Sequence, residues 1–279
     1  MTGYRLTDKE FENFRRLVYD KCGINLHLGK KELVQARLGK RMRAGNFTSF
    51  RDYYNYVVDD PSGNELTHLL DAISTNQTHF FREPQHFQFL CETALPEVLK
   101  ANGGKRARTI RLWSAGCSTG EEPYSMAISL LEALPARNAC NIRILATDLS
   151  TKVLATASSG VYDVKKVEGV PQHYLRKYFQ KGCGRWQGYV RIKKEVARLI
   201  EFKRVNFMEP FCFNQHFDVI FCRNVMIYFD KTFQEKLVDK FHTLLNPGGY
   251  LMIGHSESLT GVNHRFKYIR PTIYRKQIS

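Results

Sequence analysis

Residues 113–127, WSAGCSTGEEPYSMA, determine the fold that this sequence predicts. The apolar residues before them, from Ile110 to Trp113, are typical of a short buried strand, and a helix-like run begins at Glu121. Gly116 and Gly120 lie between the strand and the helix. A strand, a glycine turn and a helix together bring the backbone close to a polar cofactor at the carboxyl end of a parallel sheet.

The glycine spacing and the charges that follow it narrow the class of cofactor. A dinucleotide site carries Gly-x-Gly-x-x-Gly and a phosphate loop carries Gly-Lys-Ser/Thr, and this turn has neither pattern. Glu121 and Glu122 at the start of the helix would repel a phosphate group. They suit a cationic ligand with hydroxyl and amino groups, such as S-adenosylmethionine.

Two other predicted strands end in polar residues. Asp148 closes the strand 142–147, at a position where an acidic side chain accepts hydrogen bonds from ribose hydroxyls; Ser150 competes with it as a helix N-cap. The segment 218–229, DVIFCRNVMIYF, places Arg223-Asn224 at the end of a later strand. A nucleic-acid amino-methyltransferase would carry Asn/Asp-Pro-Pro-Tyr there, so this sequence argues against a base amine as acceptor.

The segment 76–83, NQTHFFRE, is either a solvated linker or a lid over a ligand that has a carboxylate and an adenine. The histidines show no ligand spacing, and we expect no metal site. His255-Ser256-Glu257 has the letters of a catalytic triad, but adjacent residues cannot adopt its geometry. We interpret Cys117 as a packing residue and not as a nucleophile.

The composition indicates a folded, reduced protein with an acidic partner. The chain has 279 residues, 43% of them hydrophobic, and a formal net charge of +15. Basic residues concentrate in 30–51 and 163–204, which favours nucleic acid, an anionic membrane or an acidic protein surface as partner. The seven cysteines form no Cys-x-x-Cys pair. We expect no secretory signal, no membrane insertion and a cytoplasmic location.

The sequence divides into a helical part and an α/β part. Residues 7–75 predict a small helical bundle, which begins with the capping box Thr7-x-x-Glu10. We expect Leu33, Ala36, Leu38 and Met42 in its core, on a helix from about 30 to 44. From residue 84 onward helices alternate with short apolar strands, which predicts a doubly wound α/β sheet. Its expected elements are helices 84–100, 121–134, 150–157 and 231–245, strands 110–114, 142–147, 199–203, 217–222 and 250–254 with a turn at 246–249 before the last, and an antiparallel pair near 266–269 and 272–276. Residues 176–198 predict an inserted antiparallel β-subdomain.

With these motifs assembled, the chain resembles the CheR-type chemotaxis-receptor methyltransferases, which form glutamyl methyl esters. The resemblance covers nearly the whole chain and rests on TNQTHFFRE, WSAGCSTGEEPYSMA, ATDLS, FCRNVMIYFDK and LNPGGYLMIGHSES, in this order. It implies an all-α N-terminal receptor-recognition domain, residues 1–75. It also implies a Rossmann-like, S-adenosylmethionine-binding catalytic domain, residues 76–279.

The resemblance also implies roles for individual residues. Arg82 and Tyr228 resemble the residues that act at the reacting centre. The implied cofactor contacts are Asn76, Thr78, Arg82, Gly116, Glu122, Asp148, Asn206, Phe207, Cys222, Arg223 and Asn224. The implied receptor contacts are Arg37, Lys40, Arg41 and Arg43 on the second helix, which face acidic methylation helices, and Gly182 and Gly184, which resemble a loop that docks a C-terminal receptor peptide by strand addition.

The resemblance therefore predicts a chemoreceptor cytoplasmic domain as partner and a monomeric enzyme, with no nucleic acid bound. The family's turn typically has Ala where this chain has Gly116-Cys117. Two alternatives remain from the residues alone. One is a nucleic-acid methyltransferase, which only the charge favours, and the other is an adaptor that binds without turnover.

Overall fold

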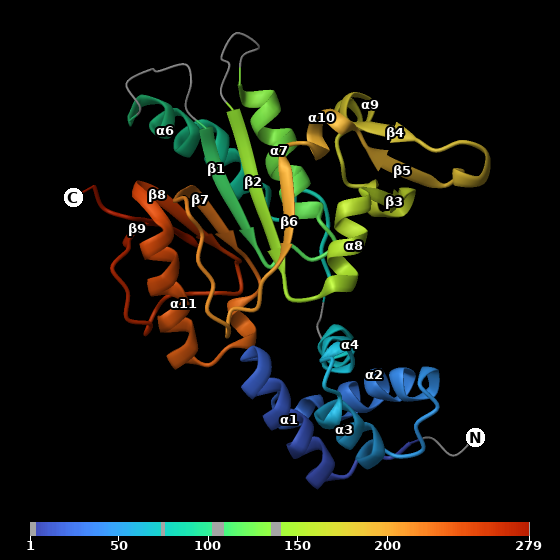
Figure 1. The fold of residues 1–279 in the computed structure, drawn as a ribbon. Coiled ribbons are helices and arrows are strands. Elements are labelled where there is room, and N and C mark those ends of the chain that lie inside the picture. Colours follow the sequence, from blue (N-terminus) through green and yellow to red (C-terminus); the bar gives the residue numbers. More distant parts are fainter. Residues whose placement is uncertain (1–3, 74–75, 102–108, 135–140, 279) are drawn as a thin grey trace.

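The computed structural model describes residues 4–73, 76–101, 109–134 and 141–278. A helical bundle forms one end of the molecule, and the α/β domain forms the other (Figure 1). A small sheet projects from the side of the α/β domain (Figure 1). The expectations of an all-α part, a doubly wound part and an inserted β-subdomain are confirmed.

The bundle follows the helix signals in the sequence. Thr7 caps the first helix in a complete capping box with Glu10, and Gly23 ends that helix in the left-handed conformation. Ser49 caps the third helix by accepting a hydrogen bond from the Asp52 amide. The helices of the described bundle are α1 (Asp8–Cys22), α2 (Lys31–Ala44), α3 (Phe50–Asp59) and α4 (Asn64–Ile73).

The core face of α2 differs from the expected one. Val34, Leu38 and Met42 are buried at spacings of four residues, whereas Leu33 and Ala36 are exposed. The expectation for Leu33 and Ala36 is therefore wrong. The pattern of α2 allowed two neighbouring apolar faces, and packing against α4 selects the one that contains Val34.

A mixed sheet of seven strands forms the centre of the described α/β domain, in the order β6-β2-β1-β7-β8-β10-β9. The first five of these strands are parallel, and β10 and β9 form the expected antiparallel edge. The bounds are β1 (Thr109–Ala115), β2 (Asn141–Asp148), β6 (Ile200–Arg204), β7 (Phe217–Cys222), β8 (Leu245–Ile253), β9 (Lys267–Arg270) and β10 (Ile273–Arg275).

Helices cover both faces of this sheet. One face packs against α5 (Pro84–Phe89), α6 (Leu95–Ala101) and α7 (Glu121–Ala133), and the other against α11 (Lys231–Leu244). A π-helical turn, Leu90–Ala94, joins α5 to α6, so the expected helix 84–100 is present with one widened turn. α8 (Thr151–Ser159) begins at its N-cap Ser150, as expected.

Two segments differ from the expected elements. Asn246–Gly249 was expected as a turn, but β8 starts at Leu245 and includes these residues. The register against β7 shifts here, and Gly248 and Gly249 exchange backbone hydrogen bonds with Lys276, so the backbone pairs in spite of Pro247. The small sheet, in the order β3-β5-β4, begins before residue 176.

The strand that the sequence did not predict in this small sheet is β3 (Val161–Asp163). It follows α8 directly and pairs with β5 (Tyr189–Ile192), which also pairs with β4 (Phe179–Lys181). The short helices α9 (Gln172–Tyr178) and α10 (Lys194–Ala197) flank the sheet.

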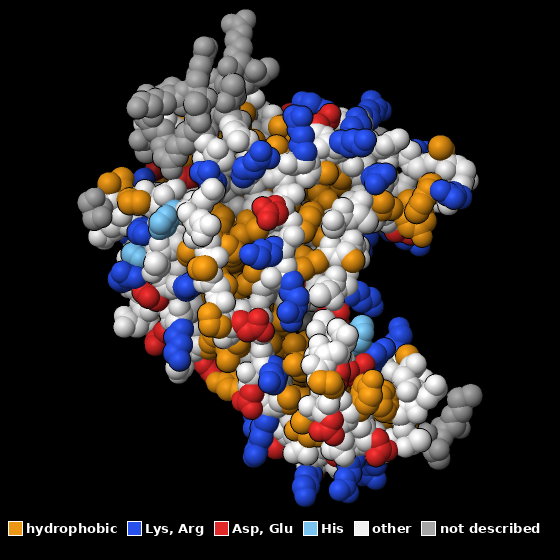
Figure 2. All heavy atoms as spheres, viewed as in Figure 1, with side chains coloured by type: hydrophobic (Ala, Val, Ile, Leu, Met, Phe, Trp, Pro, Cys, Tyr) orange, Lys and Arg blue, Asp and Glu red, His pale blue; other side chains and the backbone are white. Residues whose placement is uncertain are grey.

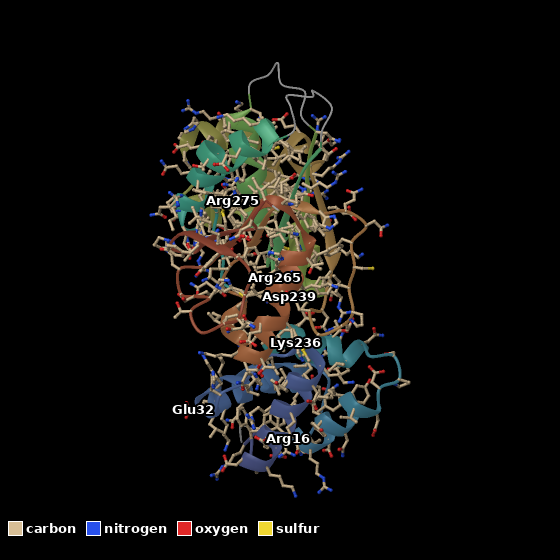
Figure 3. The ribbon with its side chains drawn as sticks, turned by 90° about the vertical axis from the view of Figure 1, so that its left-hand side faces the viewer. Arg16, Glu32, Lys236, Asp239, Arg265 and Arg275 are labelled. Atoms are coloured by element: carbon tan, nitrogen blue, oxygen red, sulfur yellow. The ribbon has the colours of Figure 1, made fainter. Side chains whose placement is uncertain are left out.

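Part of the basic excess is paired on the outer surface. Arg265 lies 2.6 Å from Asp239 of α11, and Arg275 lies 2.6 Å from Glu97. Figure 3 shows Arg265 beside Asp239, with Arg275 further from the bundle. Lys and Arg side chains also border the recess between the bundle and the small sheet in Figure 2.

Candidate functional site

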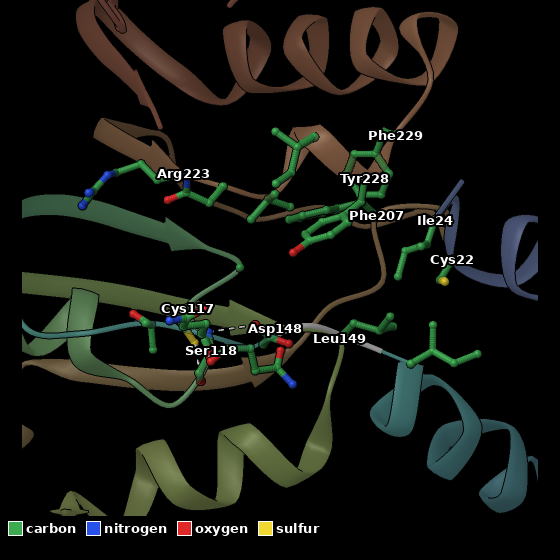
Figure 4. Close-up of a pocket in the computed structure, with 18 of the residues that line it drawn as sticks. Cys22, Ile24, Cys117, Ser118, Asp148, Leu149, Phe207, Arg223, Tyr228 and Phe229 are labelled. Atoms are coloured by element: carbon green, nitrogen blue, oxygen red, sulfur yellow. Dashed lines mark hydrogen bonds between the residues drawn. The ribbon is translucent and has the colours of Figure 1, made fainter. Parts of the chain in front are cut away.

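A pocket lies at the carboxyl ends of β1, β2 and β7 (Figure 4). The strand order reverses between β1 and β7, and open α/β sheets bind ligands at such a switch point. The segment Ile24–His27, between α1 and α2, forms the opposite wall, so the pocket lies between the two parts of the chain.

The turn after β1 needs both of its glycines. Gly116 and Gly120 adopt φ of +87° and +95°. A Cβ on Gly116 would lie 2.3 Å from a Val225 methyl group, and one on Gly120 would lie 2.8 Å from Ala157. This close approach of the backbone to neighbouring elements explains the Gly-x-x-x-Gly spacing.

Asp148 lies on the pocket wall, at the end of β2. Its carboxylate accepts hydrogen bonds from the backbone amides of Ser118, at 2.8 Å, and Ser150, at 3.0 Å. Burial raises the pKa of this carboxyl group, and the backbone hydrogen bonds oppose that rise. Two backbone donors leave acceptor capacity on the carboxylate for hydroxyl groups in the pocket.

Glu122 lines the pocket and is held by its neighbours. Its carboxylate accepts from the Ser114 hydroxyl at 2.7 Å and from Arg223 Nη1 at 3.2 Å. Arg223 is buried, and its Nη2 lies 3.1 Å from Glu83 Oε2, so one guanidinium joins two carboxylates. Burial raises the pKa of Glu122, and the Arg223 charge opposes that rise.

The loop 76–83 lies across the glycine turn. The Ser118 hydroxyl donates to the Asn76 carbonyl at 2.9 Å, and the Phe81 amide donates to the Ser125 hydroxyl at 2.9 Å. Arg82 Nη1 donates to the Gln77 carbonyl at 3.3 Å. The three residues of this loop that we expected to contact the cofactor all line the pocket: Asn76, Thr78 and Arg82.

Tyr228 faces the pocket from the segment after β7, across from Asp148 (Figure 4). Arg223 and Asn224 line the pocket from the same segment. The Tyr228 carbonyl accepts from the Asn25 amide at 2.8 Å, which ties this segment to the bundle.

The carboxylate of Glu257 holds this segment in place. It accepts hydrogen bonds from the amides of Asn224, Val225, Met226 and Ile227, and from the Gly254 amide. Sequence reasoning assigned Glu257 no role, because most of its partners are backbone amides that follow another strand, β7. The motif LNPGGYLMIGHSES includes residue 257, but nothing in its pattern signals contacts with the segment after β7.

Two of the expected cofactor residues, Cys222 and Asn206, have other surroundings than the sequence suggested. Cys222 is fully buried at the end of β7 and is absent from the described pocket lining. Asn206 lines the pocket as expected, but its side-chain amide donates to the Lys21 carbonyl of the bundle at 2.7 Å and to the nearby Glu209 carboxylate at 2.9 Å. Cys117 is buried in the turn, and burial raises its pKa well above the ordinary value, which fits a packing residue. Phe207 does line the pocket and packs edge-on against Trp113.

The basic residues of α2 fall into two groups. Arg37 lines the pocket and donates to the Ile73 carbonyl, and Lys40 and Arg43 are exposed. Arg41 binds the buried Glu65 carboxylate through two hydrogen bonds, at 2.8 and 2.5 Å. Because the Arg41 guanidinium already binds the Glu65 carboxylate, Arg41 is a less suitable receptor contact than the sequence implied.

Gly182 and Gly184 lie in the connection between β4 and β5, and neither belongs to the described lining of the cofactor pocket. A second hollow lies beside this hairpin and includes Gly182 in its lining. Trp186 and Tyr189 are half exposed at its rim, with 51% and 42% of their surfaces accessible.

The fold and this pocket define an S-adenosylmethionine-dependent methyltransferase. Residues 9–74 match the family described as "CheR methyltransferase, all-alpha domain", and residues 76–275 match "CheR methyltransferase, SAM binding domain". The chain belongs to the CheR methyltransferase family.

Curated relatives match over nearly their whole length. The chain is 39% identical to a chemotaxis protein methyltransferase of Borreliella burgdorferi, over 97% of this chain and 95% of the relative. It is 37% identical to chemotaxis protein methyltransferase 2 of Pseudomonas aeruginosa, over 97% and 94%. It is 36% identical to the chemotaxis protein methyltransferase of Escherichia coli, over 96% and 91%. These relatives give no support to the nucleic-acid alternative, and none of the described helices is long and apolar enough to cross a membrane.

Proposed function

We propose that this chain methylates glutamate side chains in the cytoplasmic domain of a chemoreceptor and forms methyl esters there. The observation that carries the proposal is the position of two basic side chains of the bundle, Lys30 and Arg37, in the wall of the cofactor pocket. An acidic helix bound along the bundle would bring its carboxylates to this wall. The names of the curated relatives support a chemotaxis substrate.

The pocket residues suit S-adenosylmethionine. Asp148 is half-buried and keeps acceptor capacity for the ribose hydroxyls, and Phe207 offers an aromatic face for the adenine. Asn76, Thr78 and Arg82 supply an amide, a hydroxyl and a cation on the side of the glycine turn. When bound, the cofactor supplies a sulfonium methyl group that a carboxylate oxygen can displace.

The acceptor needs orientation more than activation. A glutamate side chain has an ordinary pKa of about 4.3 and is ionised at neutral pH, so no general base is required. Positioning of two reactants can lower a barrier by about 7–11 kcal/mol. We assign Tyr228 to hydrogen-bond the acceptor oxygen and Arg82 to orient a carboxylate, because both line the pocket.

The two domains then have different roles. We assign receptor recognition to residues 1–75, through Arg37, Lys40 and Arg43, and cofactor binding and catalysis to 76–279. The β-subdomain, which contains β3, β5 and β4, would bind a C-terminal receptor peptide at a sheet edge, where β4 has an open side. We propose that the enzyme acts as a monomer in the cytoplasm.

A methyl-release assay tests this function. The full chain is incubated with labelled S-adenosylmethionine and a panel of chemoreceptor cytoplasmic fragments, with and without their last residues, and the base-labile methyl groups are counted. We expect release from receptor fragments and none from RNA or DNA. Labelled nucleic acid without labelled receptor would contradict the proposal.

The truncated fragments test the peptide contact separately. Removal of the last receptor residues is expected to raise KM with little change in kcat, because docking at β4 only raises the local concentration of substrate. Identical kinetics with and without those residues would refute a peptide site in the β-subdomain and leave the methylation itself standing.

A further inference from the structure

Three potential metal ligands from distant parts of the sequence meet beside the cofactor pocket. Glu83 precedes α5, His86 lies in the first turn of α5, and His255 follows β8. His86 Nδ1 lies 3.3 Å from Glu83 Oε2, and His255 Nε2 lies 3.8 Å from the same oxygen. All three ligand atoms are within 4.8 Å of one another. The sequence did not reveal this cluster because His255 is brought in by the strand order.

The buried histidine presents an unused lone pair to this cluster. The Thr272 hydroxyl donates to the Pro271 carbonyl at 2.6 Å, so its oxygen accepts from His86 Nε2, at 2.7 Å. The hydrogen of the neutral ring is therefore on Nε2, and Nδ1 is an acceptor. His86 is 1% exposed, and Nδ1 has no hydrogen-bond partner among the described residues. An acceptor thus faces a carboxylate oxygen in a buried place.

A small cation between His86 Nδ1 and Glu83 Oε2 would be a partner for both of these acceptor atoms. Zinc binds imidazole nitrogen at about 2.0–2.1 Å and carboxylate oxygen at about 2.0–2.2 Å in tetrahedral sites, which separates neighbouring ligand atoms by about 3.3–3.5 Å. The separations at Glu83 Oε2 are 3.3 and 3.8 Å. Two imidazoles and one carboxylate are also an established donor set for zinc.

The surroundings supply the other features of a metal site. The hydrogen bond from His86 Nε2 to Thr272 fixes the ring in the orientation that aims Nδ1 at Glu83. Glu83 Oε1 accepts from the His255 amide at 3.2 Å, which holds the carboxylate in place. The His255 side chain is 51% exposed, so an ion can enter from solvent and keep an open coordination position.

Two cations oppose binding and couple the cluster to the pocket. Arg223 Nη2 lies 3.1 Å from Glu83 Oε2, and Arg82 Nε lies 4.0 Å from Glu83 Oε1. These charges lower the affinity for a metal ion. An ion on Glu83 Oε2 would share that oxygen with Arg223, which also holds Glu122 in the pocket.

We propose that Glu83, His86 and His255 form a binding site for a divalent transition-metal ion of the Zn²⁺ type, next to the cofactor pocket. The site is separate from methyl transfer, which needs no metal in the proposed function. An ion bound there would change the contacts that Arg223 makes with Glu83 and Glu122.

Zinc titration of the full chain, treated with chelator and followed by calorimetry, tests this proposal. His255→Gln removes the most exposed ligand, and His216→Gln is the matched control, because His216 is exposed at the amino end of β7. We expect one Zn²⁺ per chain in the wild type and in His216→Gln. Binding should weaken at least about tenfold in His255→Gln, the loss that even an outer-shell change at a metal site produces.

Cobalt provides an independent readout. Co²⁺ added to the wild type and to His216→Gln should give the visible absorption of a nitrogen-ligated ion, which His255→Gln should lose. Failure of the wild type to bind zinc would overturn the proposal. Equal zinc affinity in the wild type and in His255→Gln would overturn it as well, because the ion would then bind elsewhere.

Discussion

Glu257→Gln should destabilise the protein and loosen the cofactor pocket. Glu257 Oε1 accepts from the amides of Val225, Met226 and Ile227, at 2.9, 2.7 and 3.3 Å. Its Oε2 accepts from the amides of Asn224, at 2.8 Å, and Gly254, at 2.6 Å. Glutamine keeps one acceptor oxygen and places a donor where the other one was.

The loss of stability in Glu257→Gln follows from the backbone amides that lose their acceptor. If the amide oxygen takes the place of Oε1, the amides of Asn224 and Gly254 face an NH₂ group. Each unsatisfied buried donor costs about 1–3 kcal/mol, so the two together cost about 2–6 kcal/mol. A neutral amide is less costly to bury than a carboxylate, so we expect the lower half of this range.

Two measurements on Glu257→Gln check this reasoning. The free energy of unfolding in urea should fall by about 2–4 kcal/mol. Binding of S-adenosylhomocysteine in calorimetry should weaken about tenfold or more, which corresponds to about 1.4 kcal/mol, because Arg223 and Tyr228 belong to the segment that Glu257 holds. Glu195→Gln, at an exposed position on α10, is the control and should change neither quantity. A stability loss below about 0.5 kcal/mol would refute the role of Glu257, because that is the range of ordinary surface changes.

Four further predictions concern the pocket and the bundle. Tyr228→Phe should lower kcat up to about tenfold, the value of one neutral hydrogen bond, and leave cofactor affinity unchanged; equal losses in both would refute its role at the acceptor. Asp148→Ala should weaken cofactor binding in calorimetry by about 1.5–3 kcal/mol, and unchanged affinity would exclude a ribose contact. Arg41→Ala should lower the free energy of unfolding by about 3 kcal/mol, because it leaves Glu65 buried without its partner, whereas the exposed Lys40→Ala should change it by less than about 0.5 kcal/mol; similar losses would contradict the assignment. Burial acts to raise the pKa of Glu65, but hydrogen bonds from Arg41 bring it below the ordinary value, so its stabilisation is present above about pH 4.5 and is lost as the pH falls; urea unfolding at about pH 6 and about pH 4 should show a larger loss in the wild type than in Glu65→Gln.

Much of the fold could be predicted because local chemistry and the final structure agree. Thr7 and Ser49 cap helices as their sequence context indicates, and Gly116 and Gly120 adopt the conformations that their turn requires. The strand β3 could not be predicted in the same way. It has three residues and little alternation, and it forms a strand because β5 pairs with it.

The part of the site that follows a strand or a turn could also be predicted. Asp148 and Arg223 were found because they end strands at the switch point of the sheet. The contacts of Glu83 and Glu257 depend on segments far away in the sequence, so no local pattern marks them. The occupation of the Asn206 side chain by the Lys21 carbonyl depends on how the bundle packs against the α/β domain.

The identity of the methylated atom tests the central proposal most directly. A chemoreceptor cytoplasmic fragment is incubated with the full chain and labelled S-adenosylmethionine, and tandem mass spectrometry locates the label. The proposed function predicts a methyl ester on glutamate side chains of the fragment, and mild base should remove it. A base-stable methyl group on any other residue type, or no label on the fragment while the cofactor is consumed, would contradict it.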